Sequence, residues 1–465
     1  MNRRRLASLL RHRIARDPLG RSARESARVV GAELWLVGGY VRDAALGCRA
    51  TDIDLIAGRG SSRLVAELAR RFSTRGFRFR KRGVTTWRFT IEGRQVDVVD
   101  ASRRGLLRDL RRRDFTLNAV AFDLVESRVL DPLGGLADLR RGRLRLPRRD
   151  VIGEDPVRAL RGARFLAQFP GFTLSAEARR EAGRAASGLR RAARERVRVE
   201  LDKLLLAAAP HRGLQMLESV DLLGSVLPEL VPLQACCAGQ DRPDVWRHTL
   251  DALARSCRPG RLPGAAVIRD ADQRRVLRWA LLLHDISKPE TLVVPADGRP
   301  TFHGHEVRGS RRAAELLERL RLPRRDRRRI CRLILCHLRP GHLADAGATP
   351  RGLRRLVREA GEDLPLLVLH AACDALASGS PDAEARWRRL RRVLRELVRL
   401  GNAREAVAPP PLLDGRELMR VLDLEPGPLV GRLLRRIRER QEEGALRTRD
   451  EALAWIRKQL RAPAP

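Results

Sequence analysis

The sequence predicts an α+β fold, with a small mixed sheet and its helices in about the first 150 residues and a mostly α-helical remainder. Two patterns carry this prediction. Short apolar runs of strand length are concentrated between residues 33 and 99, whereas apolar residues from Ile152 onward recur with helical spacing. A chain of 465 residues is also too long for a single hydrophobic core, so we expect two to four domains.

The order of these patterns predicts where the parts of the chain lie. The Pro-rich stretch AVAPPPLLDG, residues 406–415, reads as a linker before a final helical region. We expect a basic N-terminal helix in 1–30, a head with the sheet in 31–150, a helical neck in 151–235, a second helical domain in 240–395 and a helical C-terminal region in 405–465.

Charge and composition narrow the classes of function. The formal net charge is +38, and this excess of basic over acidic residues predicts a polyanionic partner, with nucleic acid as the leading candidate. Aromatic residues make up only 4% of the chain, which argues against recognition of bases by many stacked rings.

The cysteines and the apolar runs indicate a compartment. There are seven cysteines and no C-x-x-C pair, so we expect neither a disulfide framework nor a zinc ribbon, and a reducing cytoplasm fits. The chain has no apolar run of about 18 residues, so we expect no transmembrane helix. Its basic start lacks the apolar core of a signal peptide. Nothing in the sequence indicates an oligomeric state.

The first candidate site begins at the first predicted strand, Glu33–Val37. Gly38 and Gly39 follow it directly and precede a predicted helix at Val41–Leu46. A pair of glycines between strand and helix lets the backbone come close to a ligand and directs helix N–H groups at an anion such as phosphate.

Asp52 and Asp54 lie in the next apolar run, DIDLIA. Alternation along a strand places both carboxylates on one face, where they suit Mg²⁺ bound to a nucleoside triphosphate. Taken alone, a D-x-D is usually a solvated strand end and a Gly-Gly pair is usually a turn. A Gly-Gly pair followed by a D-x-D motif at this spacing is a far more specific indication of a nucleotide site than either motif alone.

Further strands complete the predicted sheet, and the last of them contains Asp97. After a helix at Ser62–Phe72, we expect strands at Phe77–Arg80, Thr85–Ile91 and Gln95–Val99.

Two arginine-rich motifs follow the sheet. In RRRDFTLNAVAFDL, residues 111–124, a basic cluster and Asp114 precede a helix-like apolar stretch. In EDPVRALRGARF, residues 154–165, four charged residues recur every third position and spiral along a predicted helix. Asp155 and Arg158 are near neighbours there, and an intrahelical ion pair is their ordinary explanation.

These motifs, in this order, resemble the bacterial (class II) branch of the tRNA nucleotidyltransferase and poly(A) polymerase family, within the polymerase β superfamily. The resemblance implies a polymerase β-like head in which Asp52 and Asp54 hold catalytic Mg²⁺. Asp97 would be a third catalytic carboxylate, with an exposed strand-end aspartate as the alternative.

The resemblance also implies how a nucleotide is bound. Asp114 would select the sugar, and Asp155 with Arg158 would form an amino-acid template for incoming C or A. A carboxylate accepts from the exocyclic amine of these bases, and a guanidinium donates to the ring nitrogen. Arg161 and Arg164 would face phosphate. The whole implied nucleotide-binding set is Gly38, Gly39, Arg42, Arg113, Asp114, Asn118, Asp155, Arg158, Arg161 and Arg164.

A histidine-rich pattern lies in the second helical domain. A lone helical histidine is seldom a ligand, but the order H…HD…H…H…D resembles the HD phosphohydrolase superfamily. Neutral imidazoles and carboxylates form a shell for a transition metal that activates water against a phosphoester. The identity of that metal is not indicated. The implied ligands are His248, His284, Asp285, His305, His337 and Asp374.

We therefore expect a template-independent enzyme that adds or repairs the 3′-terminal CCA of tRNA from CTP and ATP, with the basic neck and C-terminal region holding tRNA. The alternatives are a poly(A) polymerase of the same family, a metal-dependent HD phosphohydrolase, and a basic RNA-binding protein whose catalytic units have decayed.

One departure from the family bears on how much of CCA is added. Full CCA-adding relatives carry a sizeable mobile loop before the RRD motif, whereas here only residues 102–105 are expected to be free of secondary structure. Partial addition, of CC rather than A, is one hypothesis. The alternative is full addition with the switch elsewhere, for instance in Arg75–Val84.

Overall fold

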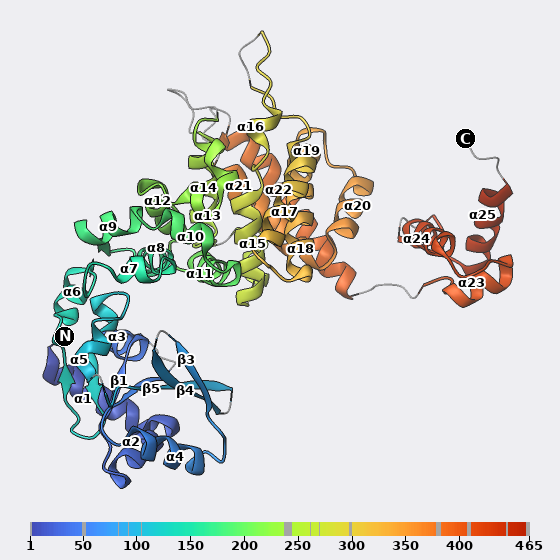
Figure 1. The fold of residues 1–465 in the computed structure, drawn as a ribbon. Coiled ribbons are helices and arrows are strands. Elements are labelled where there is room, and N and C mark those ends of the chain that lie inside the picture. Colours follow the sequence, from blue (N-terminus) through green and yellow to red (C-terminus); the bar gives the residue numbers. More distant parts are fainter. Residues whose placement is uncertain are drawn as a thin grey trace. The chain divides into compact units, whose positions relative to one another are not determined.

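The computed structural model describes residues 2–48, 53–81, 83–91, 93–103, 105–236, 244–260, 262–268, 270–296, 300–377, 383–406, 411–442 and 445–461. They form two compact units, Met1–Cys236 with Ala313–Arg327, and Cys237–Arg312 with Arg328–Pro465. The α+β prediction is confirmed, since a mixed sheet occupies the start of the chain and helices make up most of the rest (Figure 1).

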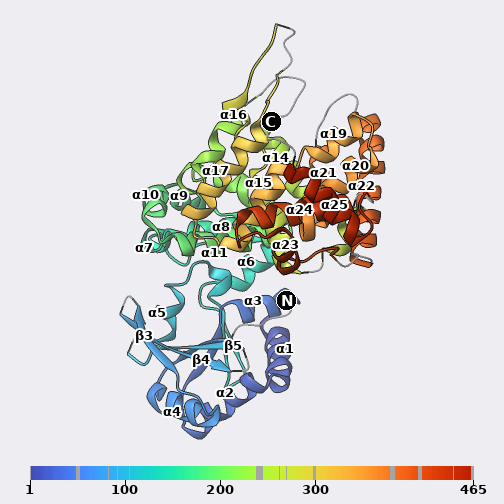
Figure 2. The same ribbon diagram turned by 90° about the vertical axis from the view of Figure 1, so that its right-hand side faces the viewer.

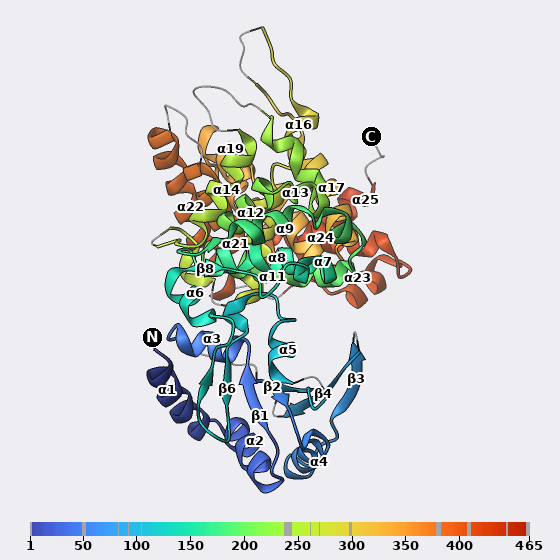
Figure 3. The same ribbon diagram turned by 60° about the vertical axis from the view of Figure 1, so that its left-hand side comes forward.

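The sheet has the strand order β3-β4-β5-β2-β1-β6-β7. Its neighbouring strands are antiparallel except for β2 and β5, which are parallel. Figure 3 shows β3 at the outer end of the sheet. The strands are β1 (Leu34–Val37), β2 (Ile53–Ala57), β3 (Phe77–Lys81), β4 (Val84–Ile91), β5 (Arg94–Asp100), β6 (Ala121–Asp123) and β7 (Val129–Leu130).

The apolar stretch after Asp114 is not helical, and this part of the sequence interpretation is wrong. A short 3₁₀ turn at Thr116–Asn118 is followed by β6, which pairs with β1. Every residue of β6 is buried. Pairing with a central strand buries these residues more completely than one face of a surface helix would, so tertiary context decides the local structure.

The predicted single N-terminal helix is two helices, α1 (Arg3–Arg16) and α2 (Pro18–Val29). Asp17 separates them, because its carboxylate accepts from Leu19 N and caps α2, while Pro18 occupies the first helical position. In the view of Figure 2, α2 and α4 (Ser61–Arg71) lie side by side below the sheet.

The opposite end of the sheet carries the elements that build the site. These are α3 (Gly39–Ala45) and α5 (Leu106–Leu110), with an apolar cluster at Val37, Ile56 and Leu110 beneath α5.

Helix α6 (Gly135–Arg141) fixes the segment that follows the RRD motif. A Cβ atom at Gly135 would lie 2.2 Å from the carbonyl oxygen of Thr116, so only glycine permits this contact. Asp131 caps α6 by accepting from Gly135 N at 2.7 Å, and Asp138 accepts from Thr116 Oγ1 at 2.6 Å. Buried polar contacts therefore hold the Thr116 segment in one position.

The remainder of the first unit is mostly helical. Helix α8 packs on α11 and α12, and Phe165 of α8 meets Phe115 edge to face, with ring centroids 5.7 Å apart. The elements are α7 (Val151–Glu154), α8 (Val157–Gln168), α9 (Ala176–Gly183), α10 (Ala186–Arg191), α11 (Arg194–Leu206), α12 (Pro210–Ser219) and α13 (Leu223–Val226), with a two-stranded sheet of β8 (Arg143–Leu144) and β9 (Thr173–Leu174).

The second unit is helical, and its C-terminal helices α23, α24 and α25 share an apolar core of their own. No helix of the described residues combines the length and apolar character needed to span a bilayer. Ala313–Arg327, the end of α17 and the start of α18, belongs to the first unit. From Val245 onward the helices are α14 (Val245–Arg255), α15 (Ala271–Leu283), α16 (Lys288–Thr291), α17 (His305–Arg319), α18 (Arg324–Cys336), α19 (Arg339–Asp345), α20 (Pro350–Ala360), α21 (Leu364–Ala377), α22 (Ala383–Ala406), α23 (Gly415–Leu422), α24 (Pro428–Glu442) and α25 (Arg449–Arg461).

Candidate active site and metal centre

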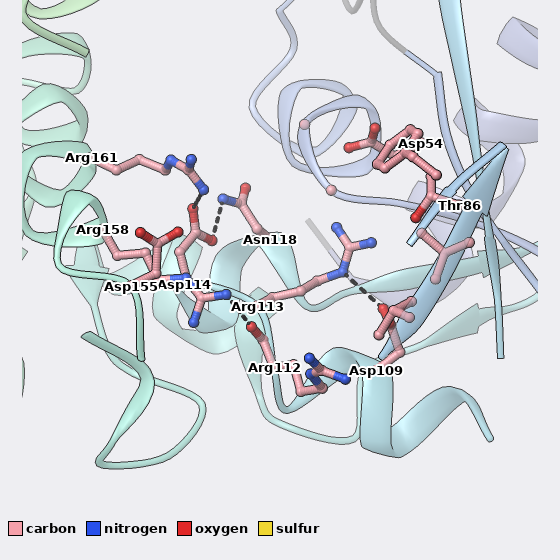
Figure 4. A pocket seen from close by; sticks show the side chains of 15 residues that line it. Asp54, Thr86, Asp109, Arg112, Arg113, Asp114, Asn118, Asp155, Arg158 and Arg161 are labelled. Atoms are coloured by element: carbon pink, nitrogen blue, oxygen red, sulfur yellow. Dashed lines mark hydrogen bonds and ion pairs between the residues drawn. The ribbon is translucent and has the colours of Figure 1, made fainter. Parts of the chain in front are cut away.

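A cavity of about 360 Å³ opens between the sheet and helix α8. In Figure 4, Asp54 and Thr86 lie on the strand side, Arg158 and Arg161 on the helix side, and Asp114 between them. The predicted site residues that line it are Gly38, Gly39, Asp54, Arg113, Asp114, Asn118, Asp155, Arg158 and Arg161.

The strand side of the cavity depends on the absence of a side chain at Gly38. This residue has a φ of +76°, and a Cβ atom there would lie 2.7 Å from Asp54 Oδ2 and 2.9 Å from Arg113 Nη1. Glycine therefore lets a carboxylate and a guanidinium approach the same stretch of backbone. The other half of the predicted pair, Asp52, lies outside the described residues.

Asp97 lies directly beside Asp54, because β2 and β5 pair these two residues. Its two oxygens accept from Arg88 Nε and Nη2 at 2.8 and 2.7 Å. Arg88, which sequence reasoning missed, thus already supplies a charge partner to Asp97. The role of Asp97 as a third catalytic carboxylate stays a prediction.

Asp114 is buried at the centre of the site and accepts from Phe115 N at 2.7 Å, Asn118 Nδ2 at 2.8 Å and Arg161 Nη1 at 3.0 Å. Burial by itself raises the pKa of Asp114, but the charge of Arg161 and these hydrogen bonds outweigh it and lower the pKa to about 2. Asn118 is held in turn by Arg42, whose Nη1 donates to Asn118 Oδ1 at 2.9 Å.

Arg161 and Arg164 converge on a second buried carboxylate, Glu200 of α11. Arg161 Nε donates to Glu200 Oε1 at 3.2 Å, and Arg164 Nε donates to Oε2 at 2.8 Å. Burial lowers the pKa of Arg161, but Asp114 and Glu200 outweigh this and raise it. Both arginines therefore belong to an internal charge network, and their predicted contact with phosphate stays a prediction.

The Asp155–Arg158 motif is built differently from the predicted helical pair. Asp155 has extended backbone angles and lies outside α8, which begins at Val157 with Pro156 as its N-cap. Arg196 Nη2 of α11 donates to Asp155 Oδ2 at 2.7 Å. Arg158 donates to the carbonyl oxygens of Val151 at 2.9 Å and Arg112 at 2.7 Å, which fixes the plane of its guanidinium.

In the second unit the predicted metal ligands come together from five places along the chain. Groups that could hold a cation are formed by His248, His284 and Asp285, and by Asp285, His305 and His337, so that Asp285 is common to both. Asp374 of α21 joins the first group, with its Oδ1 2.8 Å from His248 Nε2.

The orientation of the imidazoles suits metal binding. In His284, His305 and His337 the Nδ1 atom lies 2.9, 2.7 and 2.6 Å from the main-chain carbonyl oxygen three residues earlier. A hydrogen bond to that carbonyl requires the proton on Nδ1 and leaves Nε2 as the free acceptor, the form that ligates a metal. The donor set therefore fits a divalent transition metal.

The carboxylates of this cluster stabilise a positive charge beside them. Burial lowers the pKa of His284, but Asp285 and Asp374 outweigh burial and raise it to about 10. Burial and the neighbouring His284 lower the pKa of His337 to about 4. A cation between these groups would satisfy the carboxylates and would displace the proton of His284.

Sequence reasoning missed two residues beside this centre. Lys288 Nζ lies 2.7 Å from Asp285 Oδ2, and the buried His370 has its ring centroid 5.3 Å from that of His284. Helical spacing could have found His370, which precedes Asp374 by four residues on α21, but not Lys288, because Asp285 lies in the turn between α15 and α16.

Comparisons with known proteins agree with this arrangement. The family model described as "Poly A polymerase head domain" matches residues 34–145, "Probable RNA and SrmB- binding site of polymerase A" matches 171–233, and "HD domain" matches 245–378. An A-adding tRNA nucleotidyltransferase of Deinococcus radiodurans is 36% identical over 91% of this chain and 94% of the relative. The chain belongs to the tRNA nucleotidyltransferase family.

A second relative and a solved structure also match most of this chain. A CC-adding tRNA nucleotidyltransferase of Thermus thermophilus is 35% identical over 90% of this chain and 92% of its own length. The fold matches that of the Thermotoga maritima CCA-adding enzyme complexed with tRNA, with a TM-score of 0.60, 19% identity and 96% of each chain covered.

We expect Asp54→Ala to abolish nucleotide addition, because it removes a carboxylate from the cavity without touching the basic surfaces of the chain. The measurement is nucleotide incorporation into tRNA beside tRNA affinity, which should stay nearly unchanged. Asp150→Ala removes one exposed carboxylate at the start of α7 and serves as the matched control. Near-normal turnover of Asp54→Ala would contradict the assignment.

Because Asp285 belongs to both possible metal-binding groups, its substitution should remove more metal than substitution of a histidine that belongs to one group. Asp285→Ala should lose bound transition metal from both groups, whereas His337→Ala should lose it from one only. Metal content per chain measures this, with exposed His303→Ala as the matched control. Equal metal content in Asp285→Ala and the parent would show that the cluster does not bind metal.

Proposed function

We propose that this protein adds cytidine nucleotides from CTP to the 3′ end of tRNA and so supplies the CC part of the CCA end. The carrying observation is the convergence of Asp54, Arg113, Asp114 and the Asp155–Arg158 motif on one cavity. These groups offer a metal-binding carboxylate, a phosphate-binding cation, a sugar acceptor and a base-selecting pair, which a nucleotidyl transfer requires together.

The site fits Mg²⁺, because the Asp54 carboxylate faces a cavity lined by arginines that suit a triphosphate. Bound Mg²⁺ would lower the pKa of the tRNA 3′-OH and stabilise the departing pyrophosphate. Around it, Arg113 would hold the triphosphate, and Asp114, ionised at neutral pH, would accept from the ribose hydroxyl.

Partial addition is supported by the connection between β5 and α5. Only residues 101–105 separate these elements; Arg104 lies outside the described residues, and Ser102 and Gly105 on either side of it are hydrogen-bonded. Ser102 Oγ donates to Asp100 Oδ1 at 2.6 Å, and Gly105 N donates to Ala101 O at 2.8 Å. This connection is therefore too short to form the sizeable mobile loop of full CCA-adding relatives.

The alternative place for the switch, Arg75–Val84, is mostly occupied by paired strands. Phe77 to Lys81 pair with Arg88 to Val84 in β3 and β4. A full adder whose switch lies in Arg75–Val84 would have to open this hairpin.

A second candidate is addition of the terminal A alone. It is favoured by the relative named as A-adding, which is at least as similar to this chain as the relative named as CC-adding. The two candidates differ in the tRNA end that each accepts.

The deciding experiment offers purified protein tRNAs that end at the discriminator base or at CC, with CTP and ATP together, and sequences the products. We expect the first tRNA to stop at CC and the second to remain unextended. A complete CCA end on the first tRNA would discard partial addition, and extension of the CC-ended tRNA alone would select the A-adder.

The template motif yields a separate prediction. Asp155→Ala and Arg158→Ala should relax base choice, lowering the preference for the correct base over UTP and GTP by roughly 10- to 100-fold, because each removes hydrogen bonds to the base edge. Single-nucleotide incorporation with each triphosphate measures this, with Glu177→Ala on α9 as control. Unchanged rejection of UTP and GTP by both variants would refute the template.

A further inference from the structure

The outer strand of the sheet carries an exposed aromatic side chain close to the catalytic cavity. Strand β3 reads FRFRK, and Phe77 at its start is 69% exposed. Isolated exposed apolar residues are ordinary, but Phe77 is not isolated. Its ring stacks on that of Phe79, with centroids 6.0 Å apart and planes 26° apart, and Phe79 lines the cavity.

Strand register places these rings on the catalytic face of the sheet. Phe79 pairs with Thr86, Thr86 pairs with Val99, and both partners line the same cavity. Two residues along, Phe77 pairs with Arg88, and the row continues through Asp97 to Asp54. Residues paired across a sheet point to the same face. Phe77 and Asp54 are therefore on one face, three strand spacings or roughly 14 Å apart.

The stack is anchored from the inside of the sheet. The carboxylate of Asp97 holds Arg88 by two hydrogen bonds, and the Arg88 guanidinium lies 5.4 Å from the centroid of Phe79. Phe79 contacts Phe77 in turn. Asp97 therefore positions Arg88, and the cation–π contact with Arg88 positions the ring of Phe79. Phe77 stacks on Phe79 and remains accessible to solvent.

We propose that Phe77 and Phe79 form a stacking platform for the unpaired 3′-terminal bases of the RNA substrate, so that the reacting 3′-OH reaches Asp54. This inference rests on the proposed function and names the surface that holds its acceptor. Aromatic rings beside basic residues are the usual means of binding single-stranded nucleic acid. Arg88, which pairs with Phe77, is the basic residue on this face, whereas Arg78 and Arg80 alternate with the two phenylalanines and lie on the opposite face of the strand.

The small number of aromatic residues in the chain is compatible with this platform. With aromatic residues at 4% of the chain, extensive stacking is not available, yet two of its ten phenylalanines are adjacent on one face, and one of them, Phe79, lines the cavity. A short single-stranded end needs few stacking partners, and stacking tolerates any base because every base has a π-face.

The test compares Phe77→Ala and Phe77→Trp with the parent and with Val29→Ala, which truncates a 70% exposed side chain on α2. We expect Phe77→Ala to raise KM for tRNA roughly 5- to 100-fold with an unchanged KM for CTP, and Phe77→Trp to restore it. A tRNA with 2-aminopurine at the discriminator position should be quenched on binding the parent and Phe77→Trp, but not Phe77→Ala.

Three results would overturn the platform: an unaltered KM for tRNA in Phe77→Ala, a loss that Phe77→Trp does not restore, or a parent dimer that Phe77→Ala dissociates, because β3 would then be a subunit interface. A failure of the proposed function is distinct, since it appears in the parent itself, which would then complete the CCA end, extend only a CC-ended tRNA or add no nucleotide.

Discussion

The burial of an ionised Asp114 is the constraint on which the active site depends. A buried carboxylate is stable only when charge and hydrogen bonds replace the water it has lost. Arg161 of α8 supplies the charge, and Glu200 of α11 balances that arginine. The same few contacts therefore join the sheet to two neck helices and set the separation of Asp54 from the Asp155–Arg158 motif.

Much of the fold follows from local sequence pattern. The sequence predicts strands β1 to β5 within a few residues, because they are short apolar runs bounded by glycine or polar residues, but it does not predict β6 and β7. The apolar pattern after Asp114 predicts a helix where the structure has β6, because a buried strand and a buried helix have similar sequences over so few residues. Asp155 was placed inside a helix because the pattern of threes continues through it, whereas the restrictive geometry at Pro156 ends that pattern.

The site was predicted as a list of residues, and the structure adds the partners that hold them. Arg88, Arg196 and Glu200 come from other strands or helices, so no spacing within a motif could have revealed them. The fixed orientation of the histidines was equally hidden, because it depends on carbonyl groups that end or precede helices. Sequence motifs name the groups that carry chemistry, and tertiary contacts determine their protonation and direction.

Asp285 belongs to both ligand groups of the second unit, so the two positions cannot be independent binding sites. An ion bound at one position would withdraw electron density from the carboxylate that a second ion needs, and would repel that ion directly. It would also order Asp285, which would favour the second ion. The balance of these effects is a single coupling free energy that each ion exerts equally on the other. The centre would therefore fill with two unequal affinities, and the scarcity of free metal would decide whether it works with one ion or two.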